Sequence, residues 1–435
     1  MSDLGLSFAG LAAIVVLLIL RVPVGVTLAI VSLVGIYQIV GVGTMWGILS
    51  TVPYDFVAHW SLSSIPMFLL MGYVCYHANL TEGLFRLARA WLSWMPGGLA
   101  VASVGAAAGF SAVTGSSLAC AAAMGRIAVP QMLKNGYDKG LAAGTVAAAG
   151  TIGSMIPPSI LLLLYGIFAE VPISALFIAG IIPGALTALN YCLMIVGRVV
   201  ITPSLAPRVV DDAIWSERIG AIKETWPVIA LVIGVFGGMF AGIFSPVEAG
   251  AVGAGLSCII ALLRRSLDWN GFKAAVTETM TSTAAIFVIA IGANLLTRFL
   301  ALAGFTDWMS DTVLGGEMDQ LTLMLGMMLI FLFLGMFLDP IGIMLLTLPI
   351  FLPIVEGAGI SLILFGILMT KYLEVGLITP PVGLNVFVIK GIVGDQMRTE
   401  TIFKGVLWFI VADFVTIALL LAFPQLTLYL PSLLN

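Results

Sequence analysis

The sequence predicts an all-α polytopic membrane protein, an inverted-topology repeat with two re-entrant helical hairpins and two broken helices. Its 435 residues are 61% hydrophobic and 9% charged, with a mean hydropathy of +1.16, whereas soluble domains carry about 25% charged residues. Apolar windows recur along the whole chain. Two proline pairs, Pro157-Pro158 and Pro380-Pro381, interrupt such windows, and Pro130 and Pro353 precede them at equal spacing.

Ordinary membrane spans are expected wherever about 20 apolar residues follow one another. Such windows indicate spans at residues 5–20, 24–40, 62–80, 141–168, 173–200, 226–244, 247–263, 279–303, 358–390 and 402–423.

Two further segments, residues 98–129 and 321–352, are apolar at both ends and polar in the middle. Each is too short for two crossings, which would need about 40 residues. We therefore expect each to enter the membrane part-way and return to its own side. A non-helical tip at that depth must be buried in protein or line a wet cavity.

The proline pairs predict a break within the spans at 141–168 and 358–390. Proline lacks the backbone N–H and its ring clashes with the preceding helical turn, so a helix cannot run through a Pro-Pro pair. Interrupted hydrophobic segments at matching places in two halves of a chain are typical of secondary transporters and mark their binding sites.

The placement of basic residues predicts the orientation. An odd number of predicted spans separates the two hairpins, so the hairpins open to opposite faces. Of the 18 Lys and Arg residues, all except Arg298 and Lys371 fall on one face, Arg208 among them. The positive-inside rule makes this face cytoplasmic and puts both termini outside. The opposite loops carry the acidic residues Asp55, Glu170, Asp307, Asp311, Glu317, Asp319 and Glu356.

The repeat predicts a division of the chain into two kinds of unit. Residues 1–97 and 171–303 are expected to form scaffold helices. Residues 98–170 and 304–390 are expected to form a transport unit, each part supplying one hairpin and one broken helix. Residues 391–435 are expected to add a C-terminal helix.

Broken helices favour ion binding, because exposed carbonyls suit Na+ and exposed N–H groups suit a carboxylate. Glycine allows close approach, and serine and threonine add neutral oxygen ligands. The predicted Na+ ligands are Ser111, Thr114, Gly115, Ser116, Ser117, Thr151, Gly153 and Ser154 in the first half, and Asp339, Gly342, Gly376, Thr379, Pro380, Gly383 and Asn385 in the second. This twofold pattern predicts at least two Na+ sites. For any single serine, helix packing by small residues is an equally good explanation.

Charged residues inside spans are functional candidates because they are costly to bury. Arg298 and Asn294 share one helical face, where the cation either binds an anionic substrate or extends to the interface. The predicted substrate contacts are Arg298, Asn294, Asp339, Ser116 and Pro157.

Lys371 and Glu374 lie three residues apart on one predicted helix. At that spacing the two side chains are neighbours, so we expect them to neutralise each other as a structural pair.

Several other classes of function are disfavoured. Cys75, Cys120, Cys192 and Cys258 are isolated in apolar segments, and His59 and His77 are the only histidines, so neither a zinc site nor an organic cofactor is expected. The chain has no GxSxG sequence and Asp339 has no obvious acidic partner, which argues against an intramembrane hydrolase. An ion channel is disfavoured by the inverted repeat, and nothing indicates nucleic-acid binding.

Two motifs resemble the large membrane subunit of tripartite ATP-independent periplasmic (TRAP) transporters. They are NGYDKGLAAGT at residues 135–145, continuing to GTIG at 150–153 and IPPS at 156–159, and EVGLITPPVGLN at residues 374–385. The resemblance covers essentially the whole chain.

The resemblance implies import of an organic acid across the inner membrane of a bacterium or archaeon, driven by a Na+ gradient. It implies an elevator mechanism and two partners, a periplasmic substrate-binding protein and a separate small membrane subunit with four helices. A stand-alone Na+/anion symporter of similar architecture is the alternative. Sialic acid, C4-dicarboxylates, keto acids and aromatic acids all remain open as substrates.

Overall fold

The computed structural model describes residues 2–80, 82–207, 215–316 and 318–433, and every regular element in these ranges is helical. Within them, six helices are long and apolar enough to cross a bilayer, or seven if one pair bent by 50° counts as a single span. The chain is therefore a multi-pass membrane protein, as predicted. Arg208 and Glu317, which contributed to the predicted orientation, lie outside the described residues.

The N-terminal helices are α1 (Asp3–Ile19), α2 (Val24–Val57) and α3 (Ser64–His77), and a short 3-10 turn, η1 (Trp60–Ser63), precedes α3. The predicted span at 24–40 ends where α2 kinks, because Gly41 has φ 79° and ψ 175°. A side chain is strained in that region, whereas glycine is not. The helix then continues to Val57, a segment that we had not expected to be helical.

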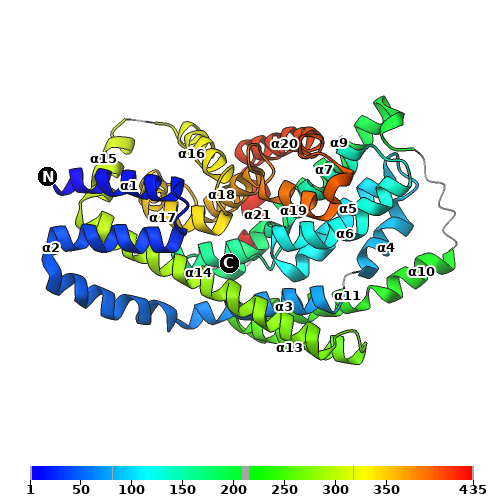
Figure 1. The fold of residues 1–435 in the computed structure, drawn as a ribbon, viewed down its shortest axis with the longest axis horizontal. Helices are drawn as coiled ribbons and strands as arrows, with labels where there is room; N and C mark the ends of the chain where they lie inside the picture. Colours follow the sequence, from blue (N-terminus) through cyan, green and yellow to red (C-terminus); the bar gives the residue numbers. More distant parts are fainter. Residues whose placement is uncertain (1, 81, 208–214, 317, 434–435) are drawn as a thin grey trace.

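Two long helices of the second half pack against these helices. Helix α14 (Trp269–Leu302) lies along α2 and α3, and α13 (Pro246–Leu263) lies against α3, so that all four follow one edge of the molecule (Figure 1). The Tyr73 and Ser282 hydroxyls are 2.8 Å apart and link α3 to α14. His77 Nε2 lies 3.2 Å from Glu278 Oε1, so this histidine has a polar partner.

Both predicted hairpins are pairs of helices joined by a short tip. The first consists of α5 (Gly98–Thr114) and α6 (Ser117–Lys134), and the second of α16 (Gln320–Gly335) and α17 (Pro340–Gly357). The second arms run about five residues further than expected, through Pro130 and Pro353. An arm of 17 residues rises about 25 Å, less than the roughly 30 Å of a bilayer core. The first arms, α5 and α16, are thus short enough for part-way entry, whereas α17 is one of the six helices long enough to cross. Part-way entry remains a prediction.

Both predicted helix breaks are present. The first separates α7 (Lys139–Gly150) and the 3-10 turn η2 (Thr151–Ser154) from α8 (Ile160–Phe168), and the second separates α18 (Leu362–Gly376) from α19 (Leu384–Val393). The proline pairs lie in these two gaps.

Helices α9 (Ile173–Ile201) and α20 (Thr399–Ala422) pack among the hairpins and broken helices. Helix α9 contacts α5, α8, α18 and α20, and α20 contacts α7, α18 and α19, while the short helix α21 (Gln425–Ser432) lies against α9. We had grouped residues 171–303 with the scaffold and residues 391–435 separately. Helices α9 and α20 contact the hairpins and the broken helices, and the division into scaffold and moving unit stays a prediction.

Short elements that we had not predicted connect the longer helices. They are α4 (Glu82–Leu92), η3 (Pro203–Leu205), α10 (Trp215–Glu224), α15 (Phe305–Leu314) and η5 (Gly394–Gln396). Arg86 on α4 is 3.0 Å from both Glu82 and Glu224, which ties α4 to α10. The span expected at 226–244 is α11 (Trp226–Val232), a π turn (Ile233–Gly237) and α12 (Gly238–Phe240).

The contact of α7 with α20 depends on glycine. A Cβ added at Gly405 would overlap the carbonyl oxygen of Gly140, and one at Gly144 would lie 2.5 Å from the carbonyl carbon of Gly405. Gly405→Ala should therefore push the helices apart and lower the free energy of unfolding by about 1–3 kcal/mol. Thermal unfolding in detergent, followed by tryptophan fluorescence, measures this loss. Gly391→Ala is the control, because its Cβ would enter open space on α19; equal stability of the two variants would contradict the prediction.

Candidate functional site

One cavity of about 90 Å³ lies where both hairpin tips meet the first helix break and the end of α18. Its lining residues are Gly115, Ser116, Ser117, Leu118, Ser154, Ile160, Leu161, Asp339, Pro340, Ile341, Glu374 and Leu377. The two halves of the repeat therefore share one site, although their contributing segments are far apart in sequence.

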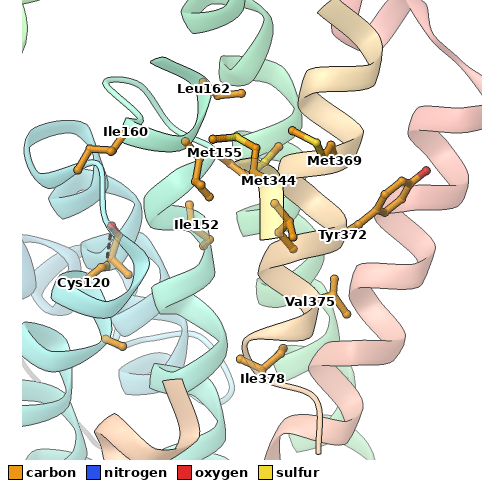
Figure 2. Packing of buried hydrophobic residues seen from close by; sticks show 14 of the residues in the cluster. Cys120, Ile152, Met155, Ile160, Leu162, Met344, Met369, Tyr372, Val375 and Ile378 are labelled. Carbon is orange, nitrogen blue, oxygen red and sulfur yellow. Dashed lines mark hydrogen bonds between the residues drawn. The ribbon is translucent and has the colours of Figure 1, made fainter. Parts of the chain in front are cut away.

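Apolar side chains close the space around this site. Figure 2 shows Met155 of the first break together with Met344 of α17 and Met369 of α18, all three fully buried. Ile152 lies on the first break, and Ile378 follows the end of α18 (Figure 2). This packing buries the backbone around the first break, so polar groups there must find partners within the protein.

The first break follows from its sequence. Helix α7 ends in the turn Thr151–Ser154, and α8 starts at Ile160 after the prolines, with the Ser159 hydroxyl accepting the Leu162 N–H at 3.2 Å. A Cβ at Gly153 would lie 2.9 Å from the Ser116 carbonyl oxygen. Glycine is thus required where the broken helix meets the tip of the first hairpin.

The second break repeats this contact. A Cβ at Gly376, the last residue of α18, would lie 2.6 Å from the Cα of Gly335, the last residue of α16. Each broken helix therefore touches its own hairpin through a glycine. The surroundings differ, because Pro157 and Pro158 are buried whereas Pro380 and Pro381 are exposed.

The tips are held by caps and turns. Gly115 ends α5 with φ 60°, and its carbonyl accepts the N–H of Ile160 at 3.3 Å, which joins the first tip to α8. At the second tip, Asp339 caps α17, and its Oδ1 accepts the N–H groups of Ile341 and Gly342, both at 3.1 Å.

Glu374 is the residue of this site that the sequence analysis missed. It is fully buried on α18, and its Oε2 accepts a hydrogen bond of 2.6 Å from the Ser117 hydroxyl. That hydroxyl is also 2.7 Å from Ser154 Oγ. The other oxygen, Oε1, has no hydrogen-bond partner among the described residues.

The predicted pairing of Lys371 with Glu374 is wrong. Lys371 Nζ instead lies 2.5 Å from Asp413 Oδ1 on α20, and both side chains are almost wholly buried. Tyr191 of α9 donates a second hydrogen bond, 2.7 Å long, to Asp413. Asp413 was itself a detectable signal, because it is a lone carboxylate within an apolar span.

The predicted cation ligands fall into three groups. Gly115, Ser116, Ser117, Ser154 and Asp339 line the cavity. The adjacent predicted residues do not, namely Ser111, Thr114, Thr151, Gly153, Gly342 and Gly376. The hydroxyls of the first three donate to carbonyls three or four residues earlier in the chain. The second-break residues Thr379, Pro380, Gly383 and Asn385 also lie outside the lining. Fully buried Asn385 donates to the Ala147 carbonyl of α7 at 3.1 Å.

The predicted substrate contacts are not brought together. Ser116 and Asp339 share the cavity, and Pro157 is buried in the first break. Asn294 lines a different cavity of about 560 Å³, together with His59 and Glu170. Arg298 is exposed, and its Nε is 3.5 Å from Asn294 Oδ1.

The donor set fits a small hard cation. Such cations prefer oxygen ligands from carboxylates, carbonyls and hydroxyls, and the cavity offers Glu374, Asp339, Ser117 and Ser154 without any basic residue in its lining. The buried Oε1 of Glu374, which has no hydrogen-bond partner in the described part of the chain, is available as a ligand for such a cation.

The fold and this site define a polytopic membrane protein with paired hairpins and broken helices. A family model described as "Tripartite ATP-independent periplasmic transporter, DctM component" matches residues 11–426. The chain belongs to this family, as the two motifs predicted.

Relatives named as TRAP transporter permeases match nearly the full chain. The C4-dicarboxylate TRAP transporter large permease protein DctM of Vibrio cholerae is 30% identical over 96% of each chain. The sialic acid TRAP transporter large permease protein SiaM of the same organism is 30% identical over 99% of this chain and 97% of its own. The ectoine TRAP transporter large permease protein TeaC of Halomonas elongata is 30% identical over 97% and 98%. These relatives are permeases, which supports the prediction that the chain is not an enzyme.

Solved structures share the fold at low identity. The MtrF protein of Neisseria gonorrhoeae is 15% identical, with a TM-score of 0.63 over 96% of this chain and 95% of its own. The YdaH transporter of Alcanivorax borkumensis is 16% identical, with a TM-score of 0.61 over 88% of each chain.

The Lys371–Asp413 pair yields a prediction about stability. Removing one partner leaves a buried charge without compensation, so Lys371→Met and Asp413→Leu should each lower the free energy of unfolding by about 3–5 kcal/mol. The double variant removes both charges and should be more stable than either single variant. Denaturation of the three purified proteins in detergent measures this coupling, and losses that simply add would contradict it.

Proposed function

We propose that this chain is the large permease subunit of a secondary transporter that imports an organic acid anion, driven by a Na+ gradient. One observation carries the proposal. Both hairpin tips and the first break share one cavity, and the side-chain oxygens of Ser116, Ser117, Ser154, Asp339 and Glu374 belong to its otherwise apolar lining. Family membership supports transport, and the relatives named for C4-dicarboxylate and sialic acid support an acidic substrate.

Two Na+ sites follow from the repeat. The first draws on the first tip and first break, from Ser111 to Ser117 and from Thr151 to Ser154. The second draws on Asp339 and Gly342 with the residues from Gly376 to Asn385. When bound, the cations supply positive charge beside which an anionic substrate is stabilised. Around them, the ends of broken helices provide carbonyls toward Na+ and N–H groups toward the acid.

The substrate is proposed to bind next to the tips, where Ser116 and Asp339 lie. The larger cavity that Asn294 lines, with Arg298 one turn away, is proposed to lie on the route by which the acid reaches this place. Its lining residues His59 and Glu170 come from loops that the charge distribution assigns to the outer face.

An elevator movement is proposed, in which the hairpins and broken helices slide as a unit against scaffold helices. The packing of α2, α3, α13 and α14 along one edge supports such a scaffold (Figure 1). Helices α9 and α20 are assigned to the moving unit because they pack against the hairpins and the broken helices.

Two protein partners are proposed, a small membrane subunit with four helices and a periplasmic substrate-binding protein. The word tripartite in the family description supports this assembly. The complex is placed in the inner membrane, with both termini of this chain on the periplasmic side, because the basic loops belong to the cytoplasm.

Reconstituted complex should take up its acid only when Na+ is present outside. Ser116→Ala and Thr379→Ala should each shift the Na+ activation curve to higher concentration while protein abundance stays near wild type, because each removes an oxygen ligand. Radiolabelled uptake into proteoliposomes, with NaCl compared with choline chloride, measures both effects.

Thr281→Ala is the matched control, because this exposed threonine of α14 donates only to a carbonyl of its own helix. Unchanged Na+ curves in the first two variants would show that the ligand assignment is wrong. Full uptake without Na+ at zero membrane potential would refute Na+ coupling. Transport by this chain alone would favour a stand-alone symporter.

A further inference from the structure

Glu374 occupies an unusual position among the charged residues of this chain. It is fully buried, precedes the second break by two residues, and lines the cavity together with both hairpin tips. The Ser117 hydroxyl satisfies Oε2 at 2.6 Å, while Oε1 is buried and has no partner among the described residues.

The nearby charges do not balance. Lys371, one turn away on α18, is engaged by Asp413 at 2.5 Å, and Tyr191 of α9 also donates to that carboxylate. The other charged residue in the cavity lining is Asp339. An ionised carboxylate without a counter-charge is costly in a membrane interior. The Glu374 carboxyl group is therefore either protonated or paired with a cation that the protein itself does not supply.

We propose that Glu374 is the ligand and counter-charge of a cation held in this cavity, with the Ser117 and Ser154 hydroxyls as further ligands. The inference rests on the proposed function. It adds the Glu374 carboxylate to a set of predicted Na+ ligands in which Asp339 was the one charged residue. Ser117 belongs to the first hairpin, Ser154 to the first break and Glu374 to α18, so one cation would join three elements.

The repeat makes this site asymmetric. Glu374 lies two residues before Gly376, and Thr151 lies two residues before Gly153, at the matching place in the first half. Thr151 carries no charge and donates its hydroxyl to the Ala148 carbonyl at 2.7 Å. A cation beside Glu374 is neutralised by the protein, so its binding needs no anionic substrate.

The test is Na+ binding by the purified full chain with its membrane partner, in the absence of substrate. Thermal unfolding is followed against increasing NaCl, with choline chloride keeping ionic strength constant. Glu374→Gln preserves shape and removes the charge, and should raise the Na+ concentration for half-maximal stabilisation by about tenfold or more. Glu356→Gln is the control, because it makes the same change at an exposed glutamate of α17.

A wild-type Na+ response in Glu374→Gln would overturn the inference, since a neutral amide would then serve as well as a carboxylate. If Glu374→Gln does not fold, Glu374→Asp decides. It keeps the charge but shortens the side chain by one methylene. We expect weaker Na+ binding and an altered preference for Na+ over Li+. Unchanged Na+ affinity and ion preference would count against the proposal.

Failure of the proposed function looks different from failure of this inference. Uptake by the wild-type complex that does not depend on Na+ refutes the proposed function. A second outcome is that uptake by the wild type depends on Na+ and that Glu374→Gln needs the same Na+ concentrations. This outcome is compatible with the proposed function and refutes only the role of Glu374.

Discussion

The structure depends on one constraint. Where a helix is broken inside the membrane, its free backbone N–H and C=O groups must form hydrogen bonds within the protein, because no water is present there. The first break meets it by contact with a hairpin tip, and the second by hydrogen bonds within the break and to α7. At the first break, the Gly115 carbonyl accepts the Ile160 N–H. At the second, the Asn385 N–H returns to the Leu377 carbonyl, and the Asn385 amide reaches α7. A cavity suited to a cation arises where the tips and the first break converge.

Local sequence rules predicted the backbone of this site well. The Pro-Pro pairs predicted both breaks, and the polar centres of two apolar segments predicted both helical hairpins. Each of these patterns is contained within a few neighbouring residues. The short helices α4, α10 and α15 were missed because their mixed composition resembles that of loops.

The electrostatic partners were predicted poorly. Spacing along α18 favoured Lys371 with Glu374, yet Lys371 pairs with Asp413, a residue 42 positions away. Helical spacing shows which residues share a face but not which distant helix packs on that face. The placement of Asn294 away from Ser116 and Asp339 has the same origin, because tertiary packing sets where α14 lies relative to the hairpins.

Gly153 and Gly376 give each broken helix a contact with its hairpin in which backbone meets backbone. Side chains between two helices absorb strain by changing rotamers, but these contacts contain no adjustable part. A displacement of the hairpin is therefore passed to the broken helix without slack. The two glycines act as rigid contacts, so the geometry of the cavity depends on residues that have no side chain.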